Sequence, residues 1–137
     1  MKKFLSTVFV FSLLISACSS PKQESQASET VESSASVISL NPEEFSAKSP
    51  NGIILDVRTP DEIALGKISS SLALDFYQTD FLTKATELPK DAEIFIYCAL
   101  GARSQEAAEL MIREGYTKVY HLQGGIQAWQ RSGFPIE

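Results

Sequence analysis

The chain has 137 residues, of which 44% are hydrophobic and 21% are charged. Its 17 acidic residues outnumber its 12 lysines and arginines, which gives a net charge of -5 at neutral pH. This length suits one small domain, and the acidic balance argues against nucleic acid as a partner. Two cysteines and one histidine are too few ligands for a zinc site. We therefore expect neither a metal nor another cofactor.

The first residues have the pattern of a secretory signal peptide. Two lysines precede an apolar run over residues 4–15, and small residues separate this run from Cys18. The run is too short to span a bilayer comfortably. Residues 15–18 resemble a bacterial lipobox, in which the cysteine becomes the lipidated first residue of the mature protein. We expect residues 1–17 to be a signal peptide that is removed; the alternative is an ordinary cleaved signal with an incidental cysteine.

A lipid on Cys18 would place the protein in the cell envelope. Two or three acyl chains give stable anchoring to a membrane, so we expect the rest of the chain to face outside the cytoplasm. Residues 18–36 are rich in Ser, Glu and Gln, and they bury too little apolar surface to fold. They are predicted to be a disordered tether that carries one domain over residues 37–137. With Cys18 acylated, Cys98 is the only thiol left, which excludes an intramolecular disulfide.

Strands and helices are predicted to alternate along the domain. Apolar runs predict strands over residues 37–40, 52–57, 71–74, 94–97 and 117–121. Capping signals and apolar spacing predict helices over residues 42–48, 80–88 and 105–113. They also predict one helix that begins at residue 60 and one that begins after residue 125. This alternation is typical of the α/β class, with an open parallel sheet of about five strands and helices on both faces.

Cys98 stands between the buried strand over residues 94–97 and the helix over 105–113. The turn between them is predicted to run from Cys98 to Arg103. In so short a turn, the backbone N–H groups of residues 99–104 can converge on the sulfur, with the positive end of the helix behind them. Such a site stabilises a thiolate and can hold an anion beside it. The alternative is a buried, unreactive thiol at a strand end.

Four segments resemble the rhodanese-homology domain, and the match extends from about residue 37 to the C-terminus. They are LDVRTPDE at residues 55–62, GKI at 66–68, IYC with its following Gly and Arg-Ser at 96–104, and GGIQAW with a later SGFP at 124–135. Their order along a whole domain makes the resemblance specific.

The resemblance implies a sulfurtransferase with a rhodanese-like fold. In that family the cysteine takes a sulfane sulfur from a small anion such as thiosulfate, or from a persulfide, and becomes a persulfide itself. It then passes the sulfur to a thiol or a cyanide-like acceptor. Cys98 is accordingly the expected nucleophile and sulfur carrier. The loop expected to bind the substrate consists of Ala99, Leu100, Gly101, Ala102, Arg103 and Ser104.

Three charged residues have an open or supporting role. Arg103 either donates to an anionic donor group or turns inward and braces the loop against an acid such as Asp56. Asp56 and Arg58 follow one strand and are expected to form a structural pair that fixes the loop. The residue after the cysteine is often Arg in family members that use thiosulfate, whereas this chain has Ala99. One cation that would hold a dianion is therefore missing, which puts thiosulfate as the preferred donor in doubt.

His121 is the only histidine. The sequence places no Ser or Cys to pair with it, so we expect a surface or hydrogen-bonded histidine at a strand end. A base that acts on Cys98 is the lesser alternative.

Two other functions compete with sulfur transfer. Phosphatases and arsenate reductases also use a cysteine and an arginine, but related dual-specificity phosphatases place five residues between them. Here four residues intervene, which makes a tighter cradle suited to a single sulfur atom. A non-catalytic module that binds a partner or senses redox state is the third possibility. An exposed thiol outside the cytoplasm is open to oxidation, so a redox partner protein would keep it reduced.

Overall fold

A computed structural model describes residues 35–137 of the chain. The signal peptide predicted over residues 1–17, the lipidated Cys18 and nearly all of the tether predicted over 18–36 lie outside the described residues. Within residues 35–137, no helix combines the length and apolarity needed to cross a bilayer.

The fold is built on a five-stranded parallel sheet. The strands are β1 (Ile38–Leu40), β2 (Ile53–Asp56), β3 (Leu72–Ala73), β4 (Ile94–Tyr97) and β5 (Val119–Leu122), and their order across the sheet is β1-β5-β4-β2-β3. The central strand β4 is buried along its whole length. Asp56 pairs in register with Tyr97, so β2 and β4 end side by side at the same edge. The prediction of an open parallel sheet of about five strands is confirmed.

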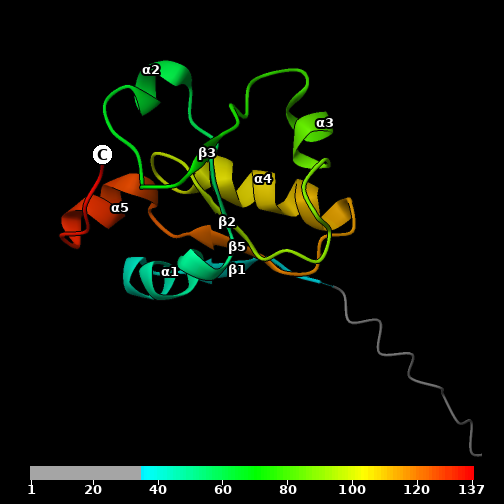
Figure 1. The fold of residues 1–137 in the computed structure, drawn as a ribbon, viewed down its shortest axis with the longest axis horizontal. Coiled ribbons are helices and arrows are strands. Elements are labelled where there is room, and N and C mark those ends of the chain that lie inside the picture. Colours follow the sequence, from blue (N-terminus) through cyan, green and yellow to red (C-terminus); the bar gives the residue numbers. More distant parts are fainter. Residues whose placement is uncertain (1–34) are drawn as a thin grey trace, which may run out of the picture. The chain divides into compact units, whose positions relative to one another are not determined.

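Helices cover both faces of this sheet, as predicted (Figure 1). One face packs against α3 (Phe81–Ala85) and α4 (Ala102–Arg113), and the other packs against α1 (Pro42–Lys48) and α5 (Gly125–Arg131). The first core contains Ile94, Ile96, Cys98, Ala107, Ala108 and Met111. The second core contains Phe45, Phe95, Tyr97, Ile126 and Trp129. Because β4 is central, its alternate side chains enter both cores.

Local capping signals set the start of two helices. Asn41 accepts from the Glu44 N–H at 2.9 Å and begins α1. Thr59 and Glu62 form the same reciprocal pair at the start of α2 (Pro60–Ile63). In each helix proline occupies the first helical position, where its missing N–H costs no hydrogen bond. The predicted starts of these two helices are confirmed.

The structure corrects the extent of several other elements. Helix α4 begins at Ala102 rather than at 105, so Arg103 and Ser104 belong to its first turn and the loop after Cys98 is shorter than predicted. The helix predicted over residues 80–88 covers only Phe81–Ala85. The strand predicted over residues 71–74 is the two-residue β3, and both of its residues are exposed at the sheet edge.

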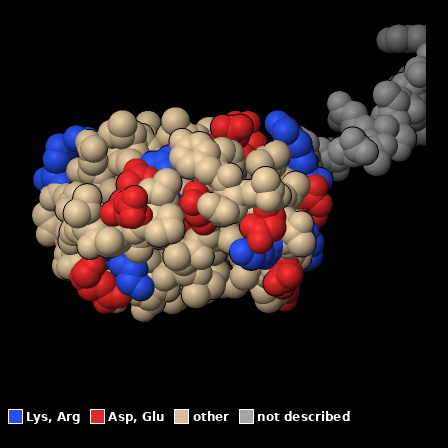
Figure 2. All heavy atoms as spheres, turned by 90° about the horizontal axis from the view of Figure 1, so that it is seen from above, with Lys and Arg blue, Asp and Glu red and all other residues tan. Residues whose placement is uncertain are grey.

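Charged side chains are scattered over the surface. Figure 2 shows acidic and basic groups interspersed on the face that it views. A mixed pattern of this kind favours solubility.

Candidate active site around Cys98

Cys98 directly follows β4, and its side chain enters the core that α4 covers. The residue is 1% exposed, and its neighbours in that core include Ala107 and Ala108. The parallel topology brings the ends of β2 and β4 together here, and ligands of open α/β sheets bind beyond such strand ends.

Two groups from the chain just after Cys98 contact its sulfur. The Gly101 N–H donates to Sγ at 3.1 Å, and the Ser104 Oγ lies 3.6 Å from Sγ. Gly101 has a φ of 104° and is the N-cap of α4, and this left-handed conformation favours glycine. Among the described residues, Gly101 supplies the backbone N–H bonded to this sulfur, whereas convergence of the N–H groups of residues 99–104 was predicted. The sulfur therefore lies against the first turn of α4, where the helix dipole favours negative charge.

The start of α5 packs against the loop that follows Cys98 and hydrogen-bonds to its backbone. The Ile126 N–H donates to the Cys98 carbonyl at 2.8 Å, and the Gln127 N–H donates to the Ala99 carbonyl at 3.3 Å. Gly125 allows this close approach, because a Cβ there would lie 2.5 Å from the backbone of Cys98 and Ala99. The sequence resemblance included these glycines, and the structure explains their presence by contact with the loop.

Asp56 and Arg58 form a buried ion pair beside the loop. The Arg58 Nε donates to Asp56 Oδ1 at 2.8 Å, and its two terminal nitrogens donate to the Glu62 and Gly66 carbonyls at 3.2 and 2.8 Å. The Tyr97 hydroxyl also donates to Asp56 Oδ2, at 2.5 Å. Burial, followed by the hydrogen bond to Asp56, raises the pKa of Tyr97 above its ordinary value. The Asp56–Arg58 pair therefore connects two segments: Arg58 bonds to residues that follow β2, and Asp56 bonds to Tyr97 at the end of β4.

Arg103 turns to Glu62 of α2 and not to Asp56. Its Nη1 and Nη2 donate to Glu62 Oε2 and Oε1 at 2.8 and 2.6 Å, and its guanidinium lies 5.4 Å from the centre of the Tyr77 ring. The hydrogen bond from Arg103 lowers the pKa of Glu62 to about 2. Of the two predicted alternatives the geometry gives the inward brace, with Glu62 as the acid; Asp56, which was named as an example, is already paired with Arg58.

Sequence reasoning missed Glu62 as a site residue. Its position in a capping box was visible in the sequence, and that box uses Oε2 to accept from the Thr59 N–H at 3.0 Å. The second role of the carboxylate depends on a contact between residues 41 positions apart, for which a single sequence gives no signal.

His121 lies in β5 and is 6% exposed, so of the two predicted environments it has the hydrogen-bonded one and not the surface one. Its Nε2 lies 2.9 Å from Ser39 Oγ of β1, and its Nδ1 lies 3.4 Å from Ser104 Oγ. The expectation that no serine pairs with it was wrong, because the sheet order brings β1 beside β5. Burial lowers the pKa of His121 below its ordinary value, although the charge of Glu109 opposes this effect. Burial of this ring thus favours its neutral form.

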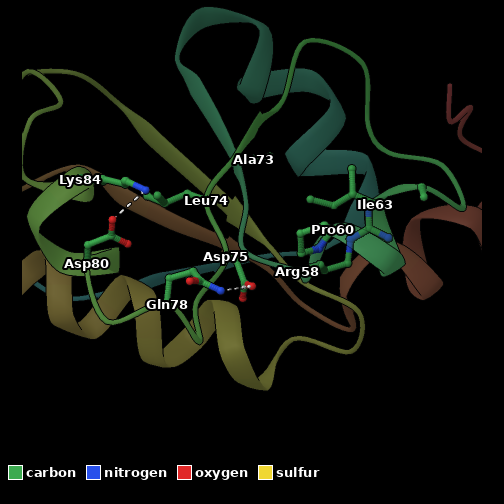
Figure 3. Close-up of a pocket in the computed structure, with 10 residues that line it drawn as sticks. Arg58, Pro60, Ile63, Ala73, Leu74, Asp75, Gln78, Asp80 and Lys84 are labelled. Atoms are coloured by element: carbon green, nitrogen blue, oxygen red, sulfur yellow. Dashed lines mark hydrogen bonds and ion pairs between the residues drawn. The ribbon is translucent and has the colours of Figure 1, made fainter.

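Two hollows open near these residues. The larger, of about 670 Å³, lies along the exposed edge at Ala73, and the Asp80–Lys84 ion pair and the Asp75–Gln78 hydrogen bond close one side of it (Figure 3). No residue of the Cys98 loop lines it. The smaller, of about 260 Å³, is lined by Ala99, Glu62 and Gln127 among others. Because Ala99 of the loop after Cys98 lines it, the smaller hollow is the better candidate for a substrate group.

Metal-ligating side chains do not gather anywhere in residues 35–137. No group of three or more His, Cys, Asp or Glu residues there has the arrangement of a metal site.

Comparisons with known proteins agree on one family. A model of the rhodanese-like domain family matches residues 41–132. A sulfurtransferase of Allochromatium vinosum is 43% identical over 84 residues, which are 61% of this chain and 77% of that protein. The thiosulfate sulfurtransferase GlpE of Ectopseudomonas mendocina is 37% identical over 100 residues, which are 72% of this chain and 88% of that protein.

Solved structures share the same fold. The crystal structure of a rhodanese-related protein from Thermoplasma volcanium matches with a TM-score of 0.66 and 30% identity, over 73% of this chain and 97% of that one. The family match covers both the Asp56 to Glu62 segment and the Cys98 loop. This chain therefore belongs to the rhodanese-like domain family and has sulfurtransferases among its relatives.

Proposed function

We propose that the chain is a sulfurtransferase or persulfide carrier of the cell envelope, with Cys98 as its nucleophile. The observation that supports this most directly is the hydrogen bond of 3.1 Å from the Gly101 N–H to Cys98 Sγ. A donor aimed at the sulfur stabilises negative charge on a thiolate.

The proposed reaction has two balanced steps. The Cys98 thiolate attacks the sulfane sulfur of the donor and forms a new S–S bond, while the bond between that sulfur and the rest of the donor breaks. The donor leaves as a thiolate, or as sulfite when the donor is thiosulfate. An acceptor thiolate then attacks the outer sulfur of the Cys98 persulfide, takes it, and regenerates the Cys98 thiolate. One sulfur atom moves, and no external oxidant or reductant is consumed.

The surroundings of Arg103 favour an organic persulfide over thiosulfate as the donor. Glu62 compensates the charge of Arg103 through two short hydrogen bonds. The neighbouring side chains of Ala99, Leu100 and Ala102 carry no charge, so a dianion meets no uncompensated cation from the loop. Leu100 is 63% exposed and offers apolar contact to an organic group. A protonated organic persulfide carries no net charge, so it needs no cation from the loop.

The lipid anchor is proposed from the sequence alone. Small residues before Cys18, at the end of an apolar run, support removal of residues 1–17 and acylation of Cys18. The domain would then act on sulfur compounds or on thiols of partner proteins outside the cytoplasm. In a bacterial host, the wild-type chain is expected to sediment with membranes and Cys18→Ser to lose this association. Equal membrane association of both forms would contradict the anchor.

Sulfur loading of Cys98 tests the central proposal. The full chain with Cys18→Ser, in which Cys98 is the only thiol, is exposed to thiosulfate or to an organic persulfide, and its intact mass is measured. A gain of one sulfur atom is expected, faster with the persulfide, and an added thiol should remove it. The further change Cys98→Ser should abolish the gain.

Two outcomes contradict this function. A mass gain that persists after Cys98→Ser places the sulfur elsewhere. No gain from any donor favours a module that binds a partner without catalysis.

A further inference from the structure

Behind Cys98 lies a connected set of polar groups that the proposed sulfur transfer does not yet use. It runs from Cys98 Sγ to Ser104 Oγ, then to His121 Nδ1, and from His121 Nε2 to Ser39 Oγ, with separations of 3.6, 3.4 and 2.9 Å. Ser104 is fully buried and His121 is 6% exposed. Buried polar groups are costly unless they are paired, and every polar atom of this set has a partner.

The Ser104 hydroxyl must change its partner when Cys98 loses its proton. In the thiol form, Cys98 S–H donates to Ser104 Oγ, and the Ser104 O–H donates to the Gly101 carbonyl at 2.9 Å. A thiolate has no hydrogen to donate, so this contact survives only if Ser104 turns its O–H to the sulfur. After this rotation of the Ser104 hydroxyl, the Gly101 carbonyl still has a hydrogen-bond partner, because the Gln105 N–H also donates to its oxygen, at 3.0 Å.

The position of His121 favours the orientation in which the Ser104 hydroxyl donates to the Cys98 sulfur. A neutral imidazole has one N–H and one bare nitrogen. When Ser39 donates to Nε2, the hydrogen of His121 is on Nδ1 and points to Ser104 Oγ. A hydroxyl that accepts this hydrogen bond is a stronger donor to the sulfur, because hydrogen bonds in a chain polarise one another.

Few charged groups act on this set. Glu109 of α4 acts on His121, and Arg103 of α4 acts on Cys98 while paired with Glu62. Strand β1 contributes the neutral Ser39. The effect of the hydroxyl on the sulfur is therefore not masked by a second charged contact.

We infer that His121 is a positioning residue that stabilises the Cys98 thiolate through the Ser104 hydroxyl. This inference rests on Cys98 being the nucleophile of the proposed function. The Ser104 hydroxyl is then a second hydrogen-bond donor to the sulfur, in addition to the backbone N–H of Gly101. His121 supports this donor through its hydrogen bond to Ser104. Ser39 holds the required tautomer from the neighbouring strand.

The test is the pH profile of Cys98 alkylation by iodoacetamide, followed by intact mass, in the full chain with Cys18→Ser. Ser104→Ala and His121→Leu are each expected to move the midpoint of the profile to higher pH. Ser104→Ala should slow alkylation near pH 7 about tenfold, as expected for loss of one hydrogen bond to a charged group. His121→Asn retains an amide donor close to the position of Nδ1 and should restore most of the rate.

A double-mutant cycle separates this role from a structural one. If His121 acts through the hydroxyl, His121→Leu changes the rate less than about twofold when Ser104 is already Ala. Effects of the two changes that multiply would overturn the inference, as would an unchanged profile in His121→Leu.

A variant at a third position protects the test against misfolding. Ser39 is exposed, so Ser39→Ala should fold even if His121→Leu does not, and it should move the profile in the same direction by a smaller amount. The matched control is the exposed Ser36→Ala, which should leave the profile unchanged. An unchanged profile in Ser39→Ala together with a slow His121→Asn would also overturn the inference. Alkylation needs no sulfur donor, so a failure to load sulfur contradicts the proposed function without touching this result.

Discussion

Arg103 and Glu62 face each other through two hydrogen bonds of 2.8 and 2.6 Å, although they lie 41 positions apart in the chain. The pair joins the first turn of α4 to α2 and compensates the one positive charge nearest the thiol loop. Both its contribution to donor choice and its contribution to stability are open to direct measurement.

Replacing the Glu62 carboxylate by an amide should change donor preference. Glu62→Gln keeps the shape and the capping role, because Gln also serves at that helix position, but it leaves the charge of Arg103 uncompensated. We expect sulfur loading from thiosulfate to become about fivefold faster, as about 1 kcal/mol of added attraction implies. Loading from a neutral organic persulfide should stay within about twofold, as expected for a donor with no net charge.

The matched control for that change is Asp61→Asn, which removes one negative charge from the neighbouring, exposed position. It should leave the ratio of the two loading rates unaltered. Equal acceleration by both variants would mean that net charge, and not the Arg103 pair, decides the result.

The same pair should make stability depend on pH below neutrality. Glu62 titrates at about 2 in the folded protein against 4.5 for an unperturbed glutamate. Between these values the unfolded chain takes up a proton that the folded protein does not, so this stabilisation is complete above about pH 4.5 and is lost as the pH falls towards 2. The difference in urea midpoint between wild type and Glu62→Gln should therefore shrink from pH 7 to pH 3. A difference that is the same at both pH values would contradict the pairing.

Loss of the Tyr97 hydroxyl should destabilise the fold. The hydroxyl donates to Asp56, accepts from the Ile68 N–H at 3.0 Å and lies 3.0 Å from Ser71 Oγ. Tyr97→Phe leaves the Ile68 N–H and the Ser71 hydroxyl without this partner and removes one hydrogen bond from Asp56, which keeps those from Arg58. We expect a loss of about 1–3 kcal/mol in the free energy of unfolding. Tyr77→Phe, at a residue that is 67% exposed, should stay within about 0.5 kcal/mol of wild type. Similar losses in both variants would show that burial of the hydroxyl is not the cause.

Two glycines provide a paired test of the contact between α5 and the Cys98 loop. Gly125 and Gly133 both have a left-handed backbone, with φ values of 61° and 81°. A Cβ at Gly125 meets the backbone of Cys98 and Ala99 at 2.5 Å, whereas a Cβ at Gly133 meets no atom within 4 Å. Either change to Ala costs about 1 kcal/mol or more of backbone strain.

Only Gly125→Ala should displace the loop. We expect its sulfur loading to fall by up to about a hundredfold, the size of effect that a misplacement of about 1 Å produces. Gly133→Ala should load sulfur at nearly the wild-type rate, with only its unfolding midpoint lowered. Equal sulfur-loading rates in the two variants would show that the contact of Gly125 with the loop does not shape the site.

The features predicted from the sequence were those that depend on neighbouring residues. The apolar run before Cys98 predicted a buried strand, and the Thr59–Glu62 pair predicted a helix start. The start of α4 was placed three residues late, because its N-cap is Gly101 and no side chain caps it. A left-handed glycine leaves no sequence signal that separates it from an ordinary turn.

The features that were missed depend on the order of strands across the sheet. Ser39 and His121 lie 82 positions apart, and only the pairing of the first and last strands brings them together. The alternation of elements predicts a parallel sheet but does not fix which strand lies beside which. The partners of Arg103 and His121 therefore had to come from the structure.

A residue of α5, well after Cys98 in the sequence, completes the surroundings of the thiol loop. The Ile126 N–H holds the Cys98 carbonyl, and Glu137 exchanges two backbone hydrogen bonds of 2.9 Å with Lys67. The ribosome makes Cys98 well before either of these residues. A nascent chain that extends only a little beyond Cys98 therefore lacks the contacts of the loop with α5, and the thiol reaches its final geometry only after α5 has formed.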